Sequence, residues 1–372
     1  MNNSNKFIPL ASPDINDSDI AEVTRILKSG MLIQGPEVER LEESIASFIG
    51  VKHCIAVSNG TATMHLSLLA LGVGEGDEVI VPGFSYVATA NVVELVGAKP
   101  VFVDIDLATF NIDTNKIEQA ITSKTKAIIT VHEFGLASDI RVINAIAAKH
   151  KLYLIEDAAC ALGAKENDQY VGSFGIAGSF SLHPRKAISS GEGGLISTND
   201  DKLATQLRIL RNHGVQYING KMDFVAAAYN YRMTDFQAAL VHSQFTRFDK
   251  IISYKQKLAE MYFNEIKNPL FTLPTVPATK KHSWQTFHVI LNDQLDQTDI
   301  INKLKESGIG TNYGAQCIPF QTYYQNKYQL DCEKLYPHAL QAYKKGLAIP
   351  LYQKMSKDDI KRVADAINKI KI

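Results

Sequence analysis

A lysine followed by a glycine-rich turn is the strongest candidate for chemistry in this chain. Lys186 lies between an apolar, strand-like stretch at residues 178–182 and a run of small residues at 189–194. A strand and a flexible turn can present the amine to a cleft, where partial desolvation favours its neutral, nucleophilic form. A neutral lysine amine can form a Schiff base with a carbonyl group. Because most lysines are exposed to solvent, the plain alternative is a surface lysine beside a turn.

Two features that follow predicted strands could hold other parts of a ligand. The run Ser-Asn-Gly-Thr-Ala-Thr at residues 58–63 precedes a predicted helix. Its small residues would let backbone N–H groups approach an anion, and the Thr61 hydroxyl adds a donor. The alternative is an ordinary turn with a helix N-cap. Tyr86 follows the next strand and could stack on a planar ring, or it could be a packed core tyrosine.

A pair of acids, Glu156 and Asp157, ends the apolar strand predicted at residues 153–155. A carboxylate at the rim of a buried sheet is unfavourable without a partner. A pyridinium nitrogen facing Asp157 would be such a partner, and the carboxylate would keep the ring protonated as an electron sink. The alternative is a helix N-cap aspartate. With Ser181 preceding Lys186, the chain offers a phosphate cradle, a stacking ring, a carboxylate and an amine, which match the parts of pyridoxal phosphate (PLP).

The elements that position these residues alternate between strands and helices. Short apolar runs at 54–57, 78–82, 100–103, 126–131, 153–155 and 179–182 predict strands, and stretches at 63–71, 86–96, 114–121 and 140–150 predict helices. This alternation predicts a mostly parallel sheet covered by helices on both faces. Ligands bind at the carboxyl ends of the strands in such sheets, so we expect the candidate residues at one edge.

The flanking regions complete the predicted architecture. Residues 16–49 are expected to be helical, with breaks at 29–30 and 35–36, and the glycines at 72–77 form a turn because they precede a strand rather than follow one. Residues 207–248 are helix-rich with a loop around 214–223. A helix at 247–266, a connector at 268–281, a strand at 285–291 and helices at 296–306 and 357–370 predict a smaller α+β unit. We predict a large domain over residues 1–246 and a small domain over 247–372, with residues 1–15 packing on the latter.

The composition excludes several classes of protein. Of the 372 residues, 45% are hydrophobic and 21% are charged, as in ordinary globular proteins. Lysine plus arginine equals aspartate plus glutamate at 39 each, which gives no basic excess for nucleic acid or anionic membranes. No apolar run is long enough to span a bilayer, and the N-terminus lacks the core of a signal peptide. The four cysteines lack metal-binding or disulfide spacing. We expect a cytoplasmic protein without a metal site.

The motifs together closely resemble the DegT/DnrJ/StrS family of sugar aminotransferases, which are PLP-dependent enzymes of fold type I. The resemblance covers essentially the whole chain. It rests on Gly-Pro-Glu-Val-Glu at 35–39, Ser-Asn-Gly-Thr-Ala at 58–62, Glu-Asp-Ala-Ala at 156–159, Phe-Ser-Leu-His-Pro-Arg-Lys at 180–186, Gly-Glu-Gly-Gly at 191–194 and Tyr-Asn-Tyr-Arg-Met at 229–233. It implies an α/β, aspartate-aminotransferase-like fold, with a mostly parallel central sheet between helices and a smaller C-terminal α+β domain.

The resemblance also implies a role for individual residues. Lys186 would hold PLP covalently, and Asp157 would pair with its pyridine nitrogen. The other implied ligands are Thr61, Ala62 and Ser181 at the phosphate, Tyr86 stacked on the ring, Cys160 beside it, and Asn230 reaching the phosphate from the other subunit of a homodimer. His183 and Tyr313 are the candidates for substrate contacts. Without the family, the residues around Asn230 would be interpreted as a loop.

Two positions bear on the type of reaction. Many members have glutamine or histidine where this chain has Cys160, and a thiol is a weaker hydrogen-bonding partner. Packing alone would then replace what that side chain does at the ring face or the 3′-oxygen. Some relatives have histidine in place of the lysine and act as sugar dehydratases, so Lys186 favours transamination.

The resemblance predicts transfer of an amino group from an amino acid, L-glutamate by family, to a nucleotide-linked keto-sugar. Residues 84–91 and 134–139 look most like those of members that act at C4 of 4-keto-6-deoxyhexoses. The nucleotide is expected near residues 310–324 and 214–223. The product would serve amino-sugar and surface polysaccharide (lipopolysaccharide or O-antigen) biosynthesis. The alternatives are a PLP- or pyridoxamine-dependent sugar dehydratase, a 3-keto-sugar aminotransferase of the same fold, and a non-catalytic regulatory homologue.

Overall fold

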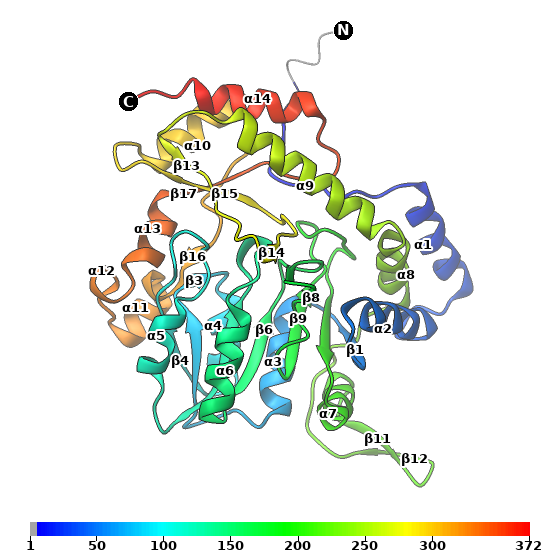
Figure 1. Cartoon of the computed structure of the whole chain (residues 1–372). Coiled ribbons are helices and arrows are strands. Elements are labelled where there is room, and N and C mark those ends of the chain that lie inside the picture. The colour runs from blue at the N-terminus through cyan, green and yellow to red at the C-terminus, as the bar shows by residue number, and fades with distance from the viewer. Residues whose placement is uncertain (1–5) are drawn as a thin grey trace.

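A seven-stranded sheet forms the centre of the computed structural model, which describes residues 6–372 (Figure 1). The strand order is β1-β10-β9-β6-β5-β2-β4. Neighbouring strands are parallel from β9 to β4, and β10 is antiparallel to both of its neighbours. The strands are β1 (His53–Val57), β2 (Glu78–Pro82), β4 (Lys99–Val103), β5 (Thr125–Val131), β6 (Tyr153–Asp157), β9 (Ala177–Ser181) and β10 (Gly194–Thr198).

The sequence prediction of this sheet is confirmed for six of the seven strands. β2 has the predicted bounds, and the other five differ only at their ends. The prediction missed β10, because this strand begins inside the glycine run and carries only two large apolar side chains, Leu195 and Ile196. β10 lies between β1 and β9 and therefore joins the strand before residue 58 to the strand before Lys186.

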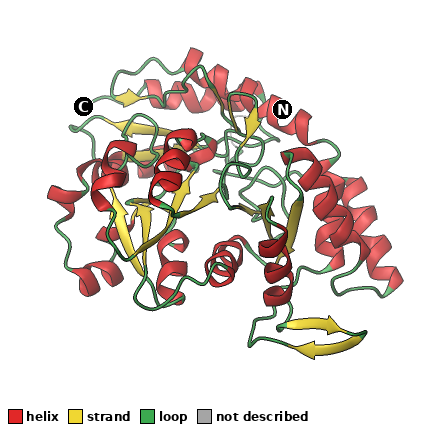
Figure 2. Ribbon diagram, turned by 60° about the horizontal axis from the view of Figure 1, so that its bottom comes forward, coloured by secondary structure: helices red, strands yellow, loops and turns green. Residues whose placement is uncertain are grey.

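Helices cover both faces of the sheet, because successive side chains of a strand point to opposite sides. In β2, Val79 and Val81 belong to a buried cluster with α3 and α4, whereas Ile80 packs against α5 and α6. The continuous apolar runs of the parallel strands are therefore buried on both sides. Figure 2 shows the helices around the strands of the sheet. The helices around this sheet are α2 (Pro36–Ile49), α3 (Gly60–Ala70), α4 (Ala88–Leu95), α5 (Thr114–Ile117), α6 (Ile140–His150), α7 (Asp201–Arg211) and α8 (Asp235–Phe245).

A second, smaller α+β unit follows the long helix α9 (Phe248–Glu265). Its antiparallel sheet has the order β13-β15-β17 and packs with helices in a separate apolar cluster, to which Ile8 from the N-terminal segment also belongs. The amide of Ile8 donates a hydrogen bond to the carbonyl of Gly308 over 2.8 Å. The elements are α10 (Gln297–Glu306), α14 (Lys357–Asn368), β13 (Phe271–Thr272), β15 (Phe287–Leu291) and β17 (Gly346–Ile349).

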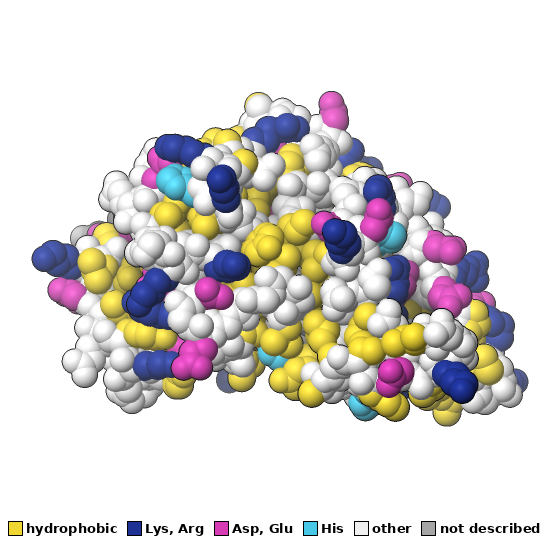
Figure 3. All heavy atoms as spheres, turned by 90° about the horizontal axis from the view of Figure 1, so that it is seen from below, with side chains coloured by type: hydrophobic (Ala, Val, Ile, Leu, Met, Phe, Trp, Pro, Cys, Tyr) yellow, Lys and Arg dark blue, Asp and Glu magenta, His cyan; other side chains and the backbone are white. Residues whose placement is uncertain are grey.

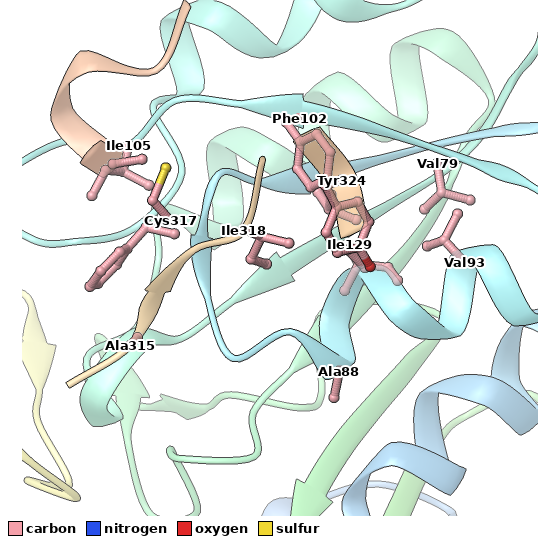
Figure 4. Close-up of a cluster of buried hydrophobic side chains, with 14 of the residues drawn as sticks. Val79, Ala88, Val93, Phe102, Ile105, Ile129, Ala315, Cys317, Ile318 and Tyr324 are labelled. Atoms are coloured by element: carbon pink, nitrogen blue, oxygen red, sulfur yellow. The ribbon is translucent and has the colours of Figure 1, made fainter. Parts of the chain in front are cut away.

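Part of the C-terminal region packs on the large sheet. Figure 4 shows Ile318 and Tyr324 beside Phe102 and Ile129, in the same buried cluster as the β2–α4 side chains. The helices of this segment are α11 (Thr322–Tyr328), α12 (Cys332–Leu335) and α13 (Pro337–Lys345). Residues 315–345 thus link the two units, and the domain boundary between residues 246 and 247 stays a prediction.

The remaining segments include one projecting hairpin. The region expected as a loop around residues 214–223 forms β11 (Val215–Ile218) and β12 (Lys221–Phe224), which extend away from the body (Figure 1). Near the N-terminus, α1 (Asp17–Ser29) ends at Gly30 in a left-handed conformation, and Pro36 starts α2, so the predicted helix breaks are confirmed. The glycines at residues 72–77 form the predicted turn. Short strands are β3 (Phe84–Ser85), β7 (Lys165–Glu166), β8 (Gln169–Tyr170), β14 (Lys280–Lys281) and β16 (Gln316–Cys317). Among the helices within residues 6–372, none has both the length and the apolarity to cross a bilayer.

Candidate active site

A cavity of about 810 Å³ opens at the carboxyl ends of the central strands. It is bounded by segments that follow β1, β2, β5, β6 and β9, so the carboxyl ends of these five strands lie at one edge, as the sequence predicts. Its polar and aromatic lining includes Asn59, Thr61, Ser85, Tyr86, Thr89, Glu133, Asp157, Cys160, Ser181, His183, Arg185 and Lys186.

The N-terminus of α3 forms one wall of this cavity. The Asn59 side chain accepts a hydrogen bond from the Ala62 amide over 2.8 Å and caps the helix. Thr61 and Ala62 line the cavity in the first turn, where the N–H groups other than the capped Ala62 amide, together with the helix dipole, favour an anion. Gly60 packs so closely on Ser181 of β9 that an added Cβ would lie 2.8 Å from the Ser181 Cβ. The run at residues 58–63 is therefore both an N-capped turn and a candidate anion site.

The two adjacent acids at the end of β6 point to opposite sides of the sheet. Glu156 is fully buried and accepts hydrogen bonds from His132 Nε2 over 3.0 Å and from three backbone amides of the 172–175 turn over 2.7–2.8 Å. Asp157 faces the cavity. Glu156 therefore organises the fold around β6, and Asp157 is the acid available to a ligand.

Asp157 is buried and only partly satisfied by hydrogen bonds. It accepts from the Thr89 hydroxyl over 2.9 Å and from the Ala159 amide over 3.1 Å. Burial raises the pKa of its carboxyl, while the Thr89 and Ala159 hydrogen bonds and the positive charge of Lys186 act against that rise. Turns rather than a helix follow β6, so the alternative of a helix N-cap aspartate is wrong. A cation beside Asp157 would stabilise its charged form.

Lys186 lies in the cavity wall and is half-buried, so the alternative of an exposed surface lysine is wrong. Its loop turns back on itself, since the Lys186 amide donates to the His183 carbonyl over 2.8 Å. The Lys186 amine donates to the Cys160 sulfur over 3.0 Å. Burial raises the pKa of the Cys160 thiol, so it is a neutral partner for the amine near pH 7.

Three further predicted residues line the same cavity. Tyr86 is 66% exposed, which excludes the alternative of a packed core tyrosine and leaves its ring free to stack on a ligand. Ser181 is half-buried next to Gly60. Burial lowers the pKa of His183, whose Nδ1 accepts a hydrogen bond from the Arg185 amide over 3.2 Å. His183 is therefore neutral at pH 7.

Two predicted residues are not part of this cavity within one chain. Tyr313 is 40% exposed and packs edge-on against Tyr343, with 5.6 Å between ring centroids, although the adjacent Gly314 and Ala315 do line the cavity. Asn230 is exposed and forms an isolated bridge with Asn212 at the base of the β11–β12 hairpin. A role of Asn230 in a second copy's cavity stays a prediction.

Sequence reasoning missed Glu133, the second buried acid of the cavity. It is 4% exposed, and its Oε2 has no hydrogen-bonding partner. Burial, and then the nearby Asp157 charge, raise the pKa of its carboxyl to about 8. Glu133 comes two residues after the end of β5, so the signal that identified Asp157, an acid directly after an apolar strand, was also present here. Sequence reasoning likewise missed Thr89, which supports Asp157.

The site thus combines an amine, a buried carboxylate, a helix N-terminus and an exposed aromatic ring. Within residues 6–372, no cluster of three or more histidine, cysteine, aspartate or glutamate side chains could hold a metal ion. The lining is therefore suited to an organic ligand with an anionic group at one end and a cationic or carbonyl group at the other. This arrangement, at the carboxyl edge of a doubly covered sheet, defines an α/β enzyme with a lysine-centred site.

The chain belongs to the DegT/DnrJ/EryC1/StrS aminotransferase family, whose family model matches residues 13–368. The spore coat polysaccharide biosynthesis protein SpsC of Bacillus subtilis is 36% identical, over 98% of this chain and 97% of its own. The PLP form of Spr1654 from Streptococcus pneumoniae, a candidate sugar aminotransferase, aligns with a TM-score of 0.92 at 28% identity, over 97% of this chain and 98% of its own.

A third relative has the same architecture. Helicobacter pylori PseC, an aminotransferase involved in the biosynthesis of pseudoaminic acid, aligns with a TM-score of 0.92 at 26% identity, over 97% of this chain and 98% of its own. The predicted family and the predicted PLP fold type I architecture are confirmed. The protein is therefore a member of a sugar aminotransferase family.

Proposed function

We propose that this protein is a PLP-dependent aminotransferase that transfers the amino group of L-glutamate to a nucleotide-linked keto-sugar. The observation that carries this proposal is the convergence of Lys186, Asp157 and the α3 N-terminus on one cavity. The Spr1654 structures, in PLP and PMP forms, support the choice of cofactor. The names of SpsC and PseC support a sugar substrate in surface polysaccharide or amino-sugar biosynthesis.

The cavity passes a test of fit for PLP. Asp157 is a buried carboxylate whose pKa is raised, so it lacks the cation that the pyridinium nitrogen would provide. At the other side, Gly60 lets the α3 N-terminus contact β9 without an intervening side chain, which leaves room for a phosphate at Thr61, Ala62 and Ser181. The chemistry of the donor set therefore matches both ends of the cofactor.

The residues of the chain then have separate tasks. PLP, when bound, supplies an electron-accepting ring that stabilises negative charge on the carbon next to its nitrogen. Lys186 would hold the cofactor and, once released, move a proton between carbon atoms as general base and acid. Cys160, 3.0 Å from the Lys186 amine, limits where that amine can lie. Asp157 would hold the proton on the ring nitrogen, and Tyr86 would stack on the ring.

The substrate is expected to enter over Tyr86 and His183. We propose that the acceptor is a 4-keto-6-deoxyhexose and that amination takes place at C4, on the resemblance of residues 84–91 and 134–139 to such family members. Tyr313 lies beside cavity-lining residues and is the candidate for contact with the nucleotide-linked sugar. The cytoplasmic location remains a prediction.

A homodimer with a shared site is part of the same proposal. Tyr217, Met222 and Phe224 on the β11–β12 hairpin are 56–67% exposed, and Tyr229 next to Asn230 is 47% exposed. Figure 3, which views the molecule from below, shows hydrophobic side chains gathered on this side. Apolar surface of this kind is typical of protein interfaces. A partner covering it would carry its Asn230 toward the cavity of this chain.

The test of the cofactor assignment is optical. Purified protein with added PLP should develop an absorbance band near the edge of the visible range, because the cofactor becomes linked to a lysine. Lys186→Ala should abolish this band, and Lys99→Ala, an exposed lysine at the opposite end of the sheet, should retain it. A wild-type protein that shows no band contradicts the proposal.

The substrate assignment needs a second experiment. A panel of nucleotide-linked keto-sugars is incubated with L-glutamate and the PLP-loaded protein, and mass spectrometry follows the exchange of a keto for an amino group. Amination of a 4-keto-6-deoxy sugar supports the proposal. Consumption of the sugar without glutamate would indicate a dehydratase, and amination of only 3-keto sugars would contradict the assignment to C4.

The shared site can be tested by complementation. Lys186→Ala and Asn230→Ala variants are inactive or weakened alone, but a mixed dimer contains one site with both wild-type residues. Mixing equal amounts after reversible dissociation should restore about a quarter of the wild-type sites. No recovery, in a mixture that sedimentation shows to contain dimers, would rule out a contribution of Asn230 across the interface.

A further inference from the structure

Glu133 is the one buried acid of the cavity that the proposed function does not use. Its backbone holds it firmly, since the Glu133 amide donates to Asn111 Oδ1 over 2.9 Å. The carbonyls of the next two residues accept hydrogen bonds from Thr286 and Ser283, over 3.3 and 2.9 Å. The side chain lines the cavity, and its Oε2 is buried without a partner. A buried polar atom in a rigid segment indicates a missing ligand, because leaving it unpaired is unfavourable.

The neighbours of Glu133 keep its carboxyl protonated. Asp157 accepts two hydrogen bonds and is the better-stabilised anion, and two nearby carboxyls do not both ionise readily. Burial and the charge of Asp157 raise the pKa of Glu133 to about 8, although the positive charge of Lys186 and the Ser85 side chain act in the opposite direction.

The other titratable groups around Glu133 bring no compensating positive charge. His282 and His288 border the small cavity behind it, and burial lowers the pKa of each to about 3. Cys160 is a neutral thiol. At neutral pH, the carboxyl of Glu133 is therefore available as a hydrogen-bond donor.

The strand order places Glu133 on a defined side of the site. Ser181 ends β9, Asp157 ends β6, and Glu133 follows β5, which is the order of these three neighbouring strands across the sheet. The α3 N-terminus lies on the Ser181 side. Glu133 is thus on the side of Asp157 that is opposite the anion site. In PLP, the phosphate arm and the phenolic oxygen likewise lie on opposite sides of the carbon that carries the aldehyde.

We propose, on the basis of the proposed function, that Glu133 binds the cofactor by donating a hydrogen bond to its phenolic oxygen. The Cys160 thiol also interacts with both Lys186 and Glu133, but it already accepts from the Lys186 amine and is a weak donor, and Asp157 is assigned to the ring nitrogen. Glu133 would therefore make the hydrogen bond to the phenolic oxygen that Cys160 cannot make. The oxygen would then not be held by packing alone, contrary to the expectation from the sequence.

The experiment is a pH titration of the absorbance band of the PLP-loaded full-length protein. The phenolic oxygen stabilises the proton on the nitrogen that joins PLP to Lys186, and a donor to that oxygen competes with this effect. Glu133→Leu should raise the pKa of the spectral transition by about one unit and weaken PLP binding about tenfold, the size expected for one hydrogen bond to a charged group. Glu133→Gln retains a donor and should shift the transition by less.

The sign of the shift decides the outcome. A fall after Glu133→Leu would show that Glu133 is a charged carboxylate, and no shift would show that it does not contact the ring; either result overturns the inference. Glu78→Gln is the matched control, because Glu78 is a buried acid at the opposite end of the same sheet and should leave the transition unchanged. If Glu133→Leu does not fold, the Glu133→Gln variant tests the inference instead. A small rise in the pKa of its spectral transition supports the inference, and an unchanged pKa overturns it. Wild-type protein without a band overturns the proposed function as well, whereas a band that Glu133 variants do not shift overturns this inference alone.

Discussion

Buried acids at the two ends of the central sheet have pKa values shifted in opposite directions. At the amino end of β2, the carboxylate of Glu78 accepts hydrogen bonds from the Thr122 hydroxyl over 2.6 Å and from the Lys99 amine over 3.3 Å. These contacts lower its pKa, with the Thr122 hydrogen bond as the largest cause. At the carboxyl end, the pKa values of Asp157 and Glu133 are raised, because burial outweighs their few hydrogen bonds.

This difference in pKa separates acids that stabilise the fold from acids that are available to bind a ligand. An under-bonded buried carboxyl is unfavourable, so where such a group lines a cavity it is a candidate for contact with a ligand. Glu156 shows that the distinction does not follow from position alone, because it lies next to Asp157 but has four donors around it. The number and charge of the donors, rather than the strand end, therefore distinguish the two groups: Glu156 has four donors and Glu78 has a charged amine beside a hydroxyl, whereas Asp157 has only a hydroxyl and an amide.

The largest expected effect concerns the amine at the carboxyl end. Lys186→Ala should lower the rate of amino transfer at least about a thousandfold, because the variant lacks both the attachment point and the group that moves the proton. The free energy of unfolding without PLP should change little, since Lys186 is only half-buried. Lys99→Ala, at the amino end, should retain full activity. Rates from a glutamate-dependent assay, together with urea unfolding, test this contrast, and equal losses in both variants would refute it.

The next effect tests whether Glu156 belongs with the fold-stabilising acids. Glu156→Leu removes the acceptor of four hydrogen bonds and should lower the free energy of unfolding by about 3 kcal/mol or more. Glu156→Gln keeps one acceptor oxygen and should lose less. Urea unfolding of the PLP-free protein measures both variants. A Glu156→Leu variant as stable as the wild type would show that the donors around a carboxyl do not separate the two groups.

A smaller effect of opposite sign is expected at Asp157. Its raised folded-state pKa means that the folded PLP-free protein loses stability as the pH rises from the ordinary value of 3.8 through the raised value. Asp157→Asn should remove this loss and raise the free energy of unfolding at pH 7.5 by about 1 kcal/mol, while it weakens the PLP absorbance band. Unfolding at pH 5 and pH 7.5 without PLP measures the change. A destabilised variant would place Asp157 with the structural acids.

The smallest effect is expected at the amino end. Glu78 has a lowered pKa, so its contribution to stability is present above its ordinary value of 4.5 and is lost as the pH falls through the lowered value. Glu78→Gln should lower the free energy of unfolding at neutral pH by about 1 kcal/mol or less, and the difference from the wild type should shrink in acid. Activity per folded molecule should be unchanged. If the stability difference between Glu78→Gln and the wild type grew in acid, the pKa of Glu78 would not be lowered in the folded protein.

The sequence was sufficient to predict the sheet, most of the cavity and the family, for physical reasons. Strands buried on both faces appear as continuous apolar runs, and polar residues at or shortly after their ends meet at one edge, as with Asp157 and Lys186. β10 was missed because an interior strand with only Leu195 and Ile196 between glycine, serine and threonine gives a weak apolar signal. Glu133 follows an apolar strand as Asp157 does, so the sequence carried a signal for an acid at this edge, but only three-dimensional packing shows that its Oε2 lacks a donor. The role proposed for Asn230 depends on a second chain, which no pattern within one chain encodes.

The β11–β12 hairpin has a consequence for how the protein behaves on dilution. Its apolar side chains contribute nothing to the core of their own chain, so any stabilisation from covering them follows mass action. Under the proposed homodimer, the fraction of complete sites would depend on protein concentration even when every chain is folded. Specific activity would then fall below the dissociation constant of the dimer, and PLP would restore it by favouring the paired state.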